Sequence, residues 1–375
     1  MSKLNIAFDA KRLYNNFTGL GNYSRTLVQN LVQYSPEHNY HLYTPKVKKN
    51  SETLPFLEHP QLQTHLPKTA FKSYWRSSSI KKDLQKAKID IYHGLSHEIP
   101  MGIHKTNIKS VVTIHDLIIK HYPEYFPWLD RKIYDWKFRY ACEHANAIIA
   151  ISESTKRDII EFYNIPAEKI HVIYQTCHER FKQLLPYSQL RQIAQQYQLP
   201  KQFYLYVGSI IPRKNLGKII DALALLPSDL QLPLVVVGNG KKYKHKVLEK
   251  VEKLHLTDKV LFPTTAYEDL PALYQLTQLL LYPSAYEGFG IPILEALYSK
   301  TPVIAANTSS LVEAGGGGAF YVENISGEEL ADAIEKVMQN EDYFKQLLKD
   351  GEAYLRQFQG RSLSEELIRL YTGLS

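Results

Sequence analysis

Residues that build disulfide or thiolate frameworks are nearly absent from this sequence. Only two cysteines, Cys142 and Cys177, occur among 375 residues, and they lie far apart in the chain. Such a pair gives neither a disulfide framework nor a metal-ligand spacing, which is typical of a reducing compartment. No apolar run reaches about 18 residues, so no segment is expected to cross a bilayer. No N-terminal signal peptide is visible, and we therefore expect a cytoplasmic protein.

The order of apolar and polar segments indicates two α/β domains. A hydrophobic content of 44% allows a large core, and strand-like apolar runs alternate with helix-like segments through residues 1–185. The polar, glutamine-rich stretch 186–200 is interpreted as a linker that carries one surface helix. The alternation resumes in 201–358, and a final helix is expected in 359–375. We predict two doubly wound, Rossmann-like domains that face each other across a cleft, with ligands at the carboxyl ends of the strands.

Positive charge is concentrated in the first predicted domain. Residues 1–185 hold 26 Lys and Arg against 17 Asp and Glu, although the whole chain has a net charge of only +7. The densest basic segment, 68–88, also carries Phe71, Tyr74 and Trp75, which would share one face of a helix. This pattern suits peripheral contact with an anionic membrane, at its inner face. A solvated basic face over an aromatic core stripe explains the pattern equally well, and no nucleic-acid-binding module is visible.

The segment Tyr286–Glu295 places two carboxylates around a glycine turn. It follows an apolar, strand-like run, and Pro292 opens an apolar helix after the turn Gly288–Gly290. A strand, a glycine turn and a helix N-terminus in this order gather free backbone N–H groups, which favour an anion. Glu287 and Glu295 stand on either side of that point. The segment therefore predicts a site for a phosphate together with a polyhydroxylated group.

Two adjacent cations stand at another predicted strand–helix junction. Arg213 and Lys214 follow the first strand of the second domain and precede its first helix, and Gly208 opens the junction. Two cations in this position can clamp a phosphate group. The alternative is a pair of exposed basic residues in a loop.

Further donor-binding candidates in the second domain follow later predicted strands. Ser309, Ser310 and Leu311 come after the strand-like segment 302–306 and could contact a diphosphate. Phe262 ends another strand, beside a loop in which backbone groups could contact a base. The glycine run at 315–318 is either a phosphate loop or a surface turn.

A pair of glycines precedes the first long helix of the chain. Gly19 and Gly21 would let the backbone approach a ligand closely at that helix N-terminus. A simple turn explains them as well, and the pattern is not a full dinucleotide-binding fingerprint because Ser24 occupies the third glycine position.

Three histidines end predicted strands of the first domain. His115 ends a buried strand, where a neutral imidazole could exchange a hydrogen bond with a reacting sugar. His93 and His97 follow another strand and are weaker candidates for contact with an acceptor. A strand-end histidine satisfied by backbone groups is the alternative in each case. Their spacing does not favour a metal site, and none is predicted.

Taken together, these residues resemble the GT-B fold, retaining glycosyltransferases of the family 4 (glycosyl transferases group 1) type. The resemblance covers nearly the whole chain, and its most specific sign is the pair Glu287 and Glu295, with seven residues between them. The chain departs from the family at Lys300, where glycine is frequent, and in the run at 315–318, where an acidic residue is frequent. The second departure leaves some donor-sugar contacts undefined.

The resemblance implies roles for the candidate residues. Residues that match Arg213 and Lys214 bind the diphosphate of the donor. The first glutamate, at Glu287, contacts sugar hydroxyls, and the second, at Glu295, holds the ribose. Backbone N–H groups for the donor come from the four residues that match Gly288, Phe289, Gly290 and Ile291.

The resemblance also implies roles in the first domain. The glycine loop at Gly19 and Gly21 closes on the phosphates, and the residue at His115 lies next to the donor sugar. The helix at 359–375 is expected to cross back to the first domain.

The implied activity is that of a retaining, metal-independent hexosyltransferase. It would move mannose or glucose from a nucleotide-diphosphate sugar to a glycan or lipid-linked acceptor in cell-surface polysaccharide biosynthesis. No acidic pair suited to a divalent ion is visible, so no cofactor or metal is expected. Three alternatives stay open: a nucleotide-sugar epimerase, a phosphorylase-like enzyme that would need a pyridoxal lysine, and a non-catalytic sugar-nucleotide binding protein.

Overall fold

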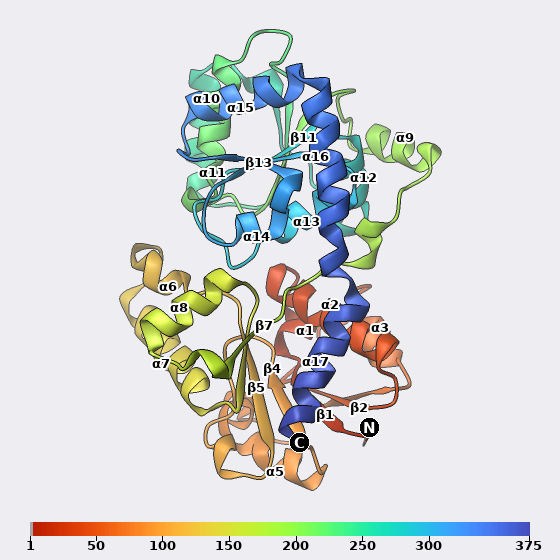
Figure 1. Ribbon diagram of the computed structural model, residues 1–375, viewed down its shortest axis with the longest axis vertical. Helices are drawn as coiled ribbons and strands as arrows, with labels where there is room; N and C mark the ends of the chain where they lie inside the picture. The colour runs from red at the N-terminus through yellow and green to blue at the C-terminus, as the bar shows by residue number, and fades with distance from the viewer. Residues whose placement is uncertain (1–2) are drawn as a thin grey trace. The chain divides into compact units, whose positions relative to one another are not determined.

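The computed structural model describes residues 3–375 and divides into two compact units. The first contains the chain up to residue 176 together with 358–375, and the second contains 177–357. Each unit is built around one parallel sheet with helices on both faces (Figure 1). This arrangement confirms the predicted α/β class with two doubly wound sheets.

The first unit holds a seven-stranded parallel sheet in the order β3-β2-β1-β4-β5-β6-β7. Strands β4 and β6 are buried along their whole length because helices cover both faces of the sheet. The strands are β1 (Asn5–Asp9), β2 (Asn39–Tyr43), β3 (Leu62–His65), β4 (Ile91–Gly94), β5 (Lys109–Ile114), β6 (Ala147–Ala150) and β7 (Ile170–Val172).

Nine α-helices and several shorter turns complete the first unit within the described residues. Ser152 accepts a hydrogen bond from the Thr155 backbone N–H at 3.0 Å and so caps the N-terminus of α8. The helices are α1 (Lys11–Asn15), α2 (Gly19–Tyr34), α3 (Leu54–Glu58), α4 (Lys72–Tyr74), α5 (Ile80–Lys86), α6 (Ile118–His121), α7 (Trp128–His144), α8 (Glu153–Tyr163) and α17 (Gly360–Leu374). A π-helical turn spans Trp75–Ser79, and 3-10 turns span Ile103–Lys105, Pro123–Tyr125 and Ala167–Lys169.

The second unit holds a six-stranded parallel sheet in the order β10-β9-β8-β11-β12-β13. In its centre, Leu280 of β11 lies beside Leu205 of β8 and Val303 of β12. This register places the carboxyl ends of three strands next to one another. The strands are β8 (Tyr204–Val207), β9 (Leu234–Val237), β10 (Val260–Leu261), β11 (Leu279–Tyr282), β12 (Val303–Ala306) and β13 (Ala319–Val322).

The helices of the second unit follow its strands in the alternation expected from the sequence. They are α9 (Tyr187–Gln196), α10 (Leu216–Leu225), α11 (Lys242–Lys253), α12 (Leu270–Leu276), α13 (Ile291–Tyr298), α14 (Leu311–Gly315), α15 (Gly327–Gln339) and α16 (Glu341–Tyr354). Short 3-10 turns span Glu179–Lys182, Pro212–Lys214, Thr257–Lys259, Tyr267–Asp269 and Gly316–Gly318, and one more spans Leu355–Phe358 where the chain returns to the first unit.

The stretch 186–200, predicted as a linker, packs on the second unit. Helix α9 lies against α12, and the Leu185 backbone N–H donates to Gln275 at 2.9 Å. The Tyr197 hydroxyl donates to Asp269 at 2.7 Å. The stretch 186–200 is polar because its helix, α9, buries only Ile193.

The last helix, α17, packs on α2 in the first unit (Figure 1). Its Tyr371 is fully buried, and the Tyr371 hydroxyl lies 2.6 Å from Nδ1 of His93 in β4. This hydrogen bond joins residues that are 278 positions apart, so it fixes the end of the chain to the first sheet.

The basic segment 68–88 does not form one continuous helix. Trp75 is buried and donates from its indole to Asp83 at 2.6 Å, whereas Phe71 and Tyr74 are exposed. The prediction that these three aromatic residues share one face is therefore wrong: Phe71 precedes α4 as its N-cap residue, and of the three only Trp75 is buried. Arg76 is also withdrawn from the surface, since it pairs with the Asp9 and Glu98 carboxylates.

No helix within the described residues 3–375 is both long enough and apolar enough to span a membrane.

Candidate functional site

Three loops of the second unit meet where neighbouring parallel strands end. They follow β8, β11 and β12, whose carboxyl ends lie side by side. The loops carry the candidate residues Arg213 and Lys214, Glu287, and Ser309 respectively. In doubly wound sheets this edge is the usual ligand position.

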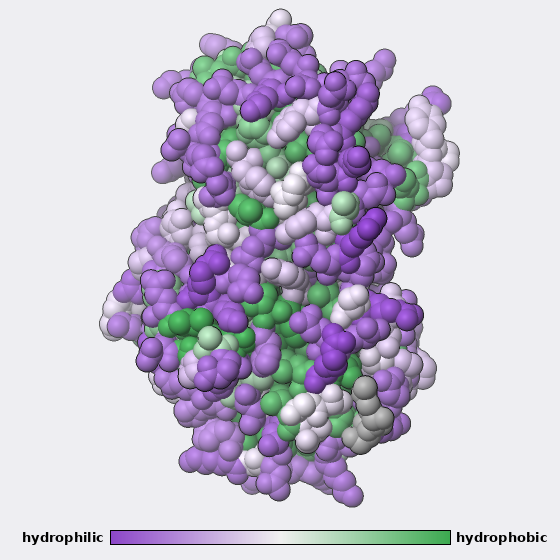
Figure 2. Space-filling view, in the orientation of Figure 1, coloured by the Kyte–Doolittle hydropathy of each residue, from purple (hydrophilic) through white to green (hydrophobic). Residues whose placement is uncertain are grey.

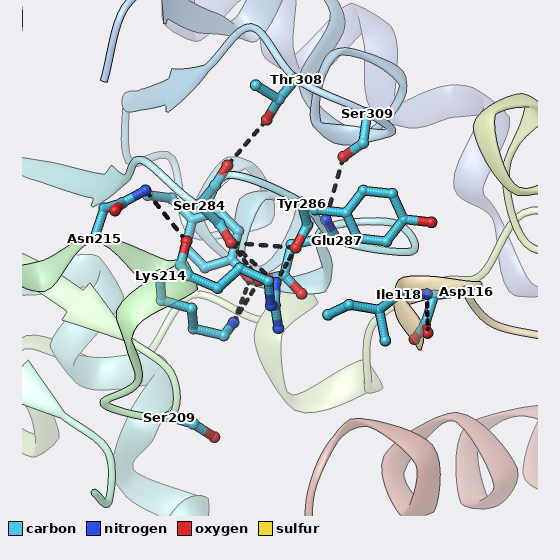
Figure 3. Close-up of polar contacts among 12 residues, drawn as sticks. Asp116, Ile118, Ser209, Lys214, Asn215, Ser284, Tyr286, Glu287, Thr308 and Ser309 are labelled. Atoms are coloured by element: carbon cyan, nitrogen blue, oxygen red, sulfur yellow. Dashed lines mark hydrogen bonds and ion pairs between the residues drawn. The ribbon is translucent and has the colours of Figure 1, made fainter. Parts of the chain in front are cut away.

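The carboxylate of Glu287 is the centre of this cluster (Figure 3). Its Oε1 atom lies 2.9 Å from Nη1 of Arg213 and 2.8 Å from Nζ of Lys214. The Ser284 hydroxyl donates to the same oxygen at 2.7 Å. Arg213 also donates to the Tyr286 carbonyl. The structure therefore brings together three residues that the sequence predicted at one site.

Burial opposes the ionisation of Glu287, but the charges of Lys214 and Arg213 and their hydrogen bonds outweigh it. The net result is a pKa of about 2, so the carboxylate is ionised at neutral pH. Lys214 has a second partner in β11: its ammonium lies 2.9 Å from the Tyr282 hydroxyl and 4.9 Å from the centre of the Tyr282 ring. Both cations are thus held in fixed positions at the sheet edge.

The loop after β12 braces the loop that carries Glu287. The Glu287 backbone N–H donates to the Ser309 hydroxyl at 3.2 Å, and the Thr308 hydroxyl donates to the Ser284 carbonyl at 2.9 Å. The Ser310 hydroxyl donates to the Glu287 and Phe289 carbonyls at 2.8 and 3.0 Å. These serine hydroxyls therefore hold the loop in place, and their predicted contact with a diphosphate stays a prediction.

Glycines with positive φ begin and end these loops. Gly290 precedes α13 with φ of +123°, and a Cβ there would lie 3.0 Å from Cδ2 of the buried Leu311. Gly208 has φ of +149°, and a Cβ there would lie 3.1 Å from the Lys214 side chain. Backbone conformation therefore favours glycine at both positions, and a Cβ there would be in tight contact with its neighbour. In the first turn of the helix that begins with Ile291, Pro292 has no N–H and the Ile293 N–H donates to the Gly290 carbonyl at 2.9 Å, so the Ile291 N–H is the candidate donor there.

Glu295 lies in a different environment from Glu287. It is buried on α13, and its Oε2 accepts a hydrogen bond from the Tyr274 hydroxyl of α12 at 2.8 Å. Burial raises the pKa of Glu295 to about 7, although this hydrogen bond and the charge of Arg180 act in the other direction. The two glutamates of the motif thus have pKa values shifted in opposite directions, and the predicted ribose contact of Glu295 stays a prediction.

Phe262 follows the short strand β10, as predicted. The ammonium of Lys244 lies 4.8 Å from the centre of its ring. This cation–π contact supports the loop, and the predicted contact with a base stays a prediction.

The glycine loop of the first unit begins α2. Asn16 organises it, since its Oδ1 accepts from the Thr18 and Gly21 backbone N–H groups at 3.0 Å each. A Cβ at Gly21 would lie 1.7 Å from the Asn16 carbonyl oxygen, whereas a Cβ at Gly19 would have nothing within 4 Å. Gly21 is therefore explained by local packing, whereas the space beside Gly19 is open and its predicted contact with a ligand stays a prediction.

His115 and His97 lie together at the carboxyl ends of β5 and β4. Their ring centres are 5.3 Å apart, and His115 Nε2 lies 2.9 Å from the Leu95 carbonyl oxygen. Burial lowers the pKa of each to about 3, so both are neutral at physiological pH. His97 has φ of +61° and stacks on Phe138, and its Nδ1 has no hydrogen-bond partner among the described residues.

His93 is fully engaged within the first unit. Its Nδ1 lies 2.6 Å from the Tyr371 hydroxyl, and its Nε2 lies 2.7 Å from the Thr113 hydroxyl. Both ring nitrogens therefore have hydrogen-bond partners within the first unit. The weak prediction that His93 contacts an acceptor has no support in these contacts, because the ring connects β4 to β5 and α17.

Several residues of the second-unit cluster were missed at the level of sequence. Ser284 and Tyr282 contact Glu287 and Lys214, and Asn215, in the left-handed region with φ of +55°, donates to the Pro283 carbonyl at 2.9 Å. Their position directly beside the predicted motifs was the available signal. Nothing in the residue types distinguished them from ordinary loop residues. Among the described residues, no group of three or more His, Cys, Asp or Glu side chains could hold a metal ion.

Two family models match most of the chain. The model described as Glycosyltransferase Family 4 matches residues 17–177, and the model described as Glycosyl transferases group 1 matches residues 191–353. The two matches correspond closely to the two compact units.

The chain is also similar to curated bacterial proteins. It is 28% identical over 292 residues to an O-antigen chain mannosyltransferase B from Escherichia coli, which covers 77% of this chain and 75% of that protein. It is 29% identical over 304 residues to the serotype-specific mannosyltransferase WbdA from Escherichia coli, which covers 76% of this chain. The matched part is only 36% of WbdA, so the chain spans about a third of that relative.

Solved structures share the fold. Anabaena HepE in complex with UDP-glucose superposes with a TM-score of 0.77 at 18% identity, over 99% of this chain and 100% of that one. WaaG, a glycosyltransferase involved in lipopolysaccharide biosynthesis, superposes with a TM-score of 0.72 at 20% identity, over 98% and 100% of the two chains.

The two glycines of the α2 loop make a matched pair of substitutions. Gly21→Ala is expected to destabilise the chain by about 2 kcal/mol or more, since its Cβ would collide with the Asn16 carbonyl. Gly19→Ala is expected to leave the melting temperature unchanged. Loss of transfer activity in stable Gly19→Ala would support a ligand contact there, whereas full activity would contradict it.

Glu295 is expected to make stability depend on pH in a defined window. The folded-state pKa of Glu295, about 7, lies above the ordinary value of 4.5. Its contribution to the free energy of unfolding is therefore fully present below pH 4.5 and is lost as pH rises through 7. Glu295→Gln should therefore be more stable than the parent at pH 8, by up to about 3 kcal/mol, with a smaller difference at pH 5. Urea unfolding at both pH values measures this, with the exposed α16 variant Glu352→Gln as control. A constant difference between parent and Glu295→Gln would contradict the prediction.

Proposed function

Because the chain belongs to the glycosyltransferases of the family 4 and group 1 type, we propose that it transfers a hexose from a nucleotide-diphosphate sugar to a glycan or lipid-linked acceptor. The GT-B fold expected from the sequence is confirmed by the likeness to HepE and WaaG. The proposed pathway class is the biosynthesis of a cell-surface polysaccharide, and the named relatives in O-antigen biosynthesis support it.

The observation that carries this proposal is the contact of Glu287 with two cations at one sheet edge. A departing diphosphate develops negative charge, which fixed cations stabilise without reorganisation. Arg213 and Lys214 are held by contacts with Glu287, Ser284 and Tyr282. They are therefore preorganised for an anion, and the Ile291 backbone N–H at the start of α13 is a further candidate donor at the same edge.

We propose that transfer proceeds with retention of the anomeric configuration and without a metal ion. In this step the anomeric C–O bond of the donor breaks, and the acceptor oxygen forms a new bond on the same face. The departing diphosphate takes the proton of the acceptor hydroxyl. Arg213 and Lys214 would balance the charge on the diphosphate, and Glu287, already ionised, would accept hydrogen bonds from the sugar hydroxyls.

Mannose is the first candidate for the transferred sugar. The support is that the similar Escherichia coli proteins are mannosyltransferases. Glucose remains the second candidate on the sequence resemblance. For the first unit, we propose that the neutral imidazole of His115 contacts the donor sugar and that Gly19 approaches its phosphates.

A donor panel tests the function. GDP-mannose is expected to raise the melting temperature more than UDP-glucose or free nucleotide, because a ligand that binds the folded state stabilises it by mass action. NMR of the product should show the anomeric configuration of the donor, and turnover should persist in excess chelator. An inverted anomer, or loss of turnover with chelator, would refute retention or metal independence respectively.

Replacement of Lys214 tests the proposed anion clamp. Lys214→Ala is expected to reduce turnover by about 10² to 10³, since it removes a charge that stabilises the leaving group. The control is Lys218→Ala, an exposed lysine four residues later on α10. Steady-state kinetics and melting temperatures of both variants make the comparison, and near-normal turnover in folded Lys214→Ala would remove this residue from the site.

A further inference from the structure

Arg25 is buried in the first long helix of the first unit. Hydrophilic residues cover most of the molecular face seen in Figure 2, whereas Arg25 in α2 is only 3% exposed. A buried guanidinium is costly unless hydrogen bonds and an anion compensate its charge. The partners of Arg25 therefore indicate which part of the structure depends on it.

The Arg25 guanidinium donates hydrogen bonds to both sides of the glycine loop, residues 16–21. Its Nη1 donates to the Leu13 carbonyl in α1 and to the Asn16 carbonyl at the start of the loop, each at 2.9 Å. Its Nη2 donates to the side-chain oxygen of Asn22, in the first turn of α2. One side chain thus connects α1, the glycine loop and the start of α2.

The Asn16 carbonyl that Arg25 contacts also determines the path of the loop. A Cβ at Gly21 would lie 1.7 Å from this oxygen, and Oδ1 of Asn16 accepts from the Gly21 backbone N–H at 3.0 Å. The carbonyl and the side chain of Asn16 therefore both face Gly21. Because Arg25 donates to that carbonyl, the orientation of Asn16 depends on the guanidinium.

A carboxylate from a third segment balances the charge of Arg25. Oε2 of Glu52 lies 3.8 Å from Nε of Arg25, and both side chains are largely buried. Glu52 lies in a turn that Asn50 closes, since Oδ1 of Asn50 accepts from the Glu52 and Thr53 backbone N–H groups at 3.1 Å each. The anion that faces Arg25 is therefore held in place by its own turn.

The same arginine contacts the aromatic side chain of the glycine loop. The guanidinium carbon of Arg25 lies 5.4 Å from the centre of the Phe17 ring, and the Lys48 ammonium lies 4.9 Å from it. Both contacts are cation–π interactions. Arg25 thus holds the loop through its backbone and through its one aromatic residue.

We propose that Arg25 is a positioning residue that fixes the glycine loop in the conformation that binds the donor phosphates. This inference rests on the proposed function, in which the backbone at Gly19 approaches those phosphates. A Cβ at Gly19 would have no atom within 4 Å, so packing on that side does not hold this part of the loop. The loop is held instead beside Gly19, at Asn16 and Asn22, where Arg25 donates.

The alternative is that Arg25 only stabilises the fold. Apolar residues of the same volume often stabilise a protein as well as a buried ion pair does, so stability alone does not account for a charge at this position. The two roles differ in a measurable way. Lower stability reduces the fraction of folded molecules, whereas a displaced loop weakens the affinity of the folded molecules for the donor.

The test uses Arg25→Lys in the full chain. Lysine keeps the charge, but one ammonium cannot reproduce the fixed fork that reaches Leu13, Asn16 and Asn22. Calorimetric titration with GDP-mannose and with UDP-glucose, without acceptor, measures the Kd of folded protein. We expect the Kd of the donor that binds the parent to rise roughly 10- to 100-fold, as for a displaced positioning group. Hydrogen exchange should accelerate at the Gly21 and Asn22 amides, because the loop opens more often.

Matched variants separate this role from general effects. In Arg139 of α7, Nη2 also donates to a carbonyl, that of Phe162 at 3.2 Å, and the guanidinium lies 4.8 Å from the Tyr163 ring centre. Arg139→Lys should leave both the Kd and the exchange of the glycine loop at the parental values. Glu52→Gln removes the charge that faces Arg25, and its Kd should lie between those of the parent and Arg25→Lys. Melting temperatures identify unfolded variants, and Glu52→Gln decides the matter if Arg25→Lys does not fold.

Distinct results would overturn the role of Arg25 and the proposed function. A folded Arg25→Lys with the parental Kd, or with unchanged exchange at Gly21 and Asn22, would overturn the positioning role alone. An equal rise of Kd in Arg139→Lys would do the same, because the effect would then not be specific to the glycine loop. A parent chain that binds neither nucleotide sugar would overturn the proposed function and this role with it.

Discussion

The candidate donor site depends on one constraint: two adjacent cations at the edge of a sheet need a fixed anionic partner. Glu287 meets this need by placing one oxygen within 2.9 Å of both Arg213 and Lys214. Removing one member of such a group leaves uncompensated charge, which costs far more than the group contributes as a whole. The Glu287 loop must therefore be held firmly, and the hydroxyls of Ser309 and Ser310 bond its backbone.

The same motif shows how environment determines the protonation of two identical side chains. Glu287 stands among cations, and its pKa falls to about 2 although burial acts against this. Glu295 has a tyrosine hydroxyl as its bonded neighbour, and burial raises its pKa to about 7. A ligand whose hydroxyls donate to Glu295 would favour the ionised form, whereas burial favours the protonated form. Binding at this position would accordingly be linked to proton release.

Local sequence patterns were sufficient for the fold class and for the strand-end positions of Arg213, Lys214 and Glu287. They were insufficient where a residue's role depends on a partner far along the chain. His93 and Tyr371 are 278 residues apart, and no local pattern indicates that this histidine is saturated by the last helix. A Cβ at Gly21 would collide with the Asn16 carbonyl oxygen of the same loop. This glycine, which the sequence suggested as a ligand contact, therefore has a structural explanation. Phe71 and Tyr74 were expected to lie with Trp75, but Phe71 precedes the helix as its N-cap residue and only Trp75 is buried.

In the first unit, lysine density and the exposure of aromatic side chains identify different segments of the chain. Lysine density is a property of the sequence and identifies the segment 68–88. Exposure of Trp128 and Trp136 is a property of the fold, because α7 uses the side with Asp135 and Phe138 to pack inward. In sequence alone, an apolar stripe on a helix is expected to face the core. The stripe on α7 faces solvent because a second set of partners already satisfies its inner side, and an apolar surface of this kind is typical of an interaction site.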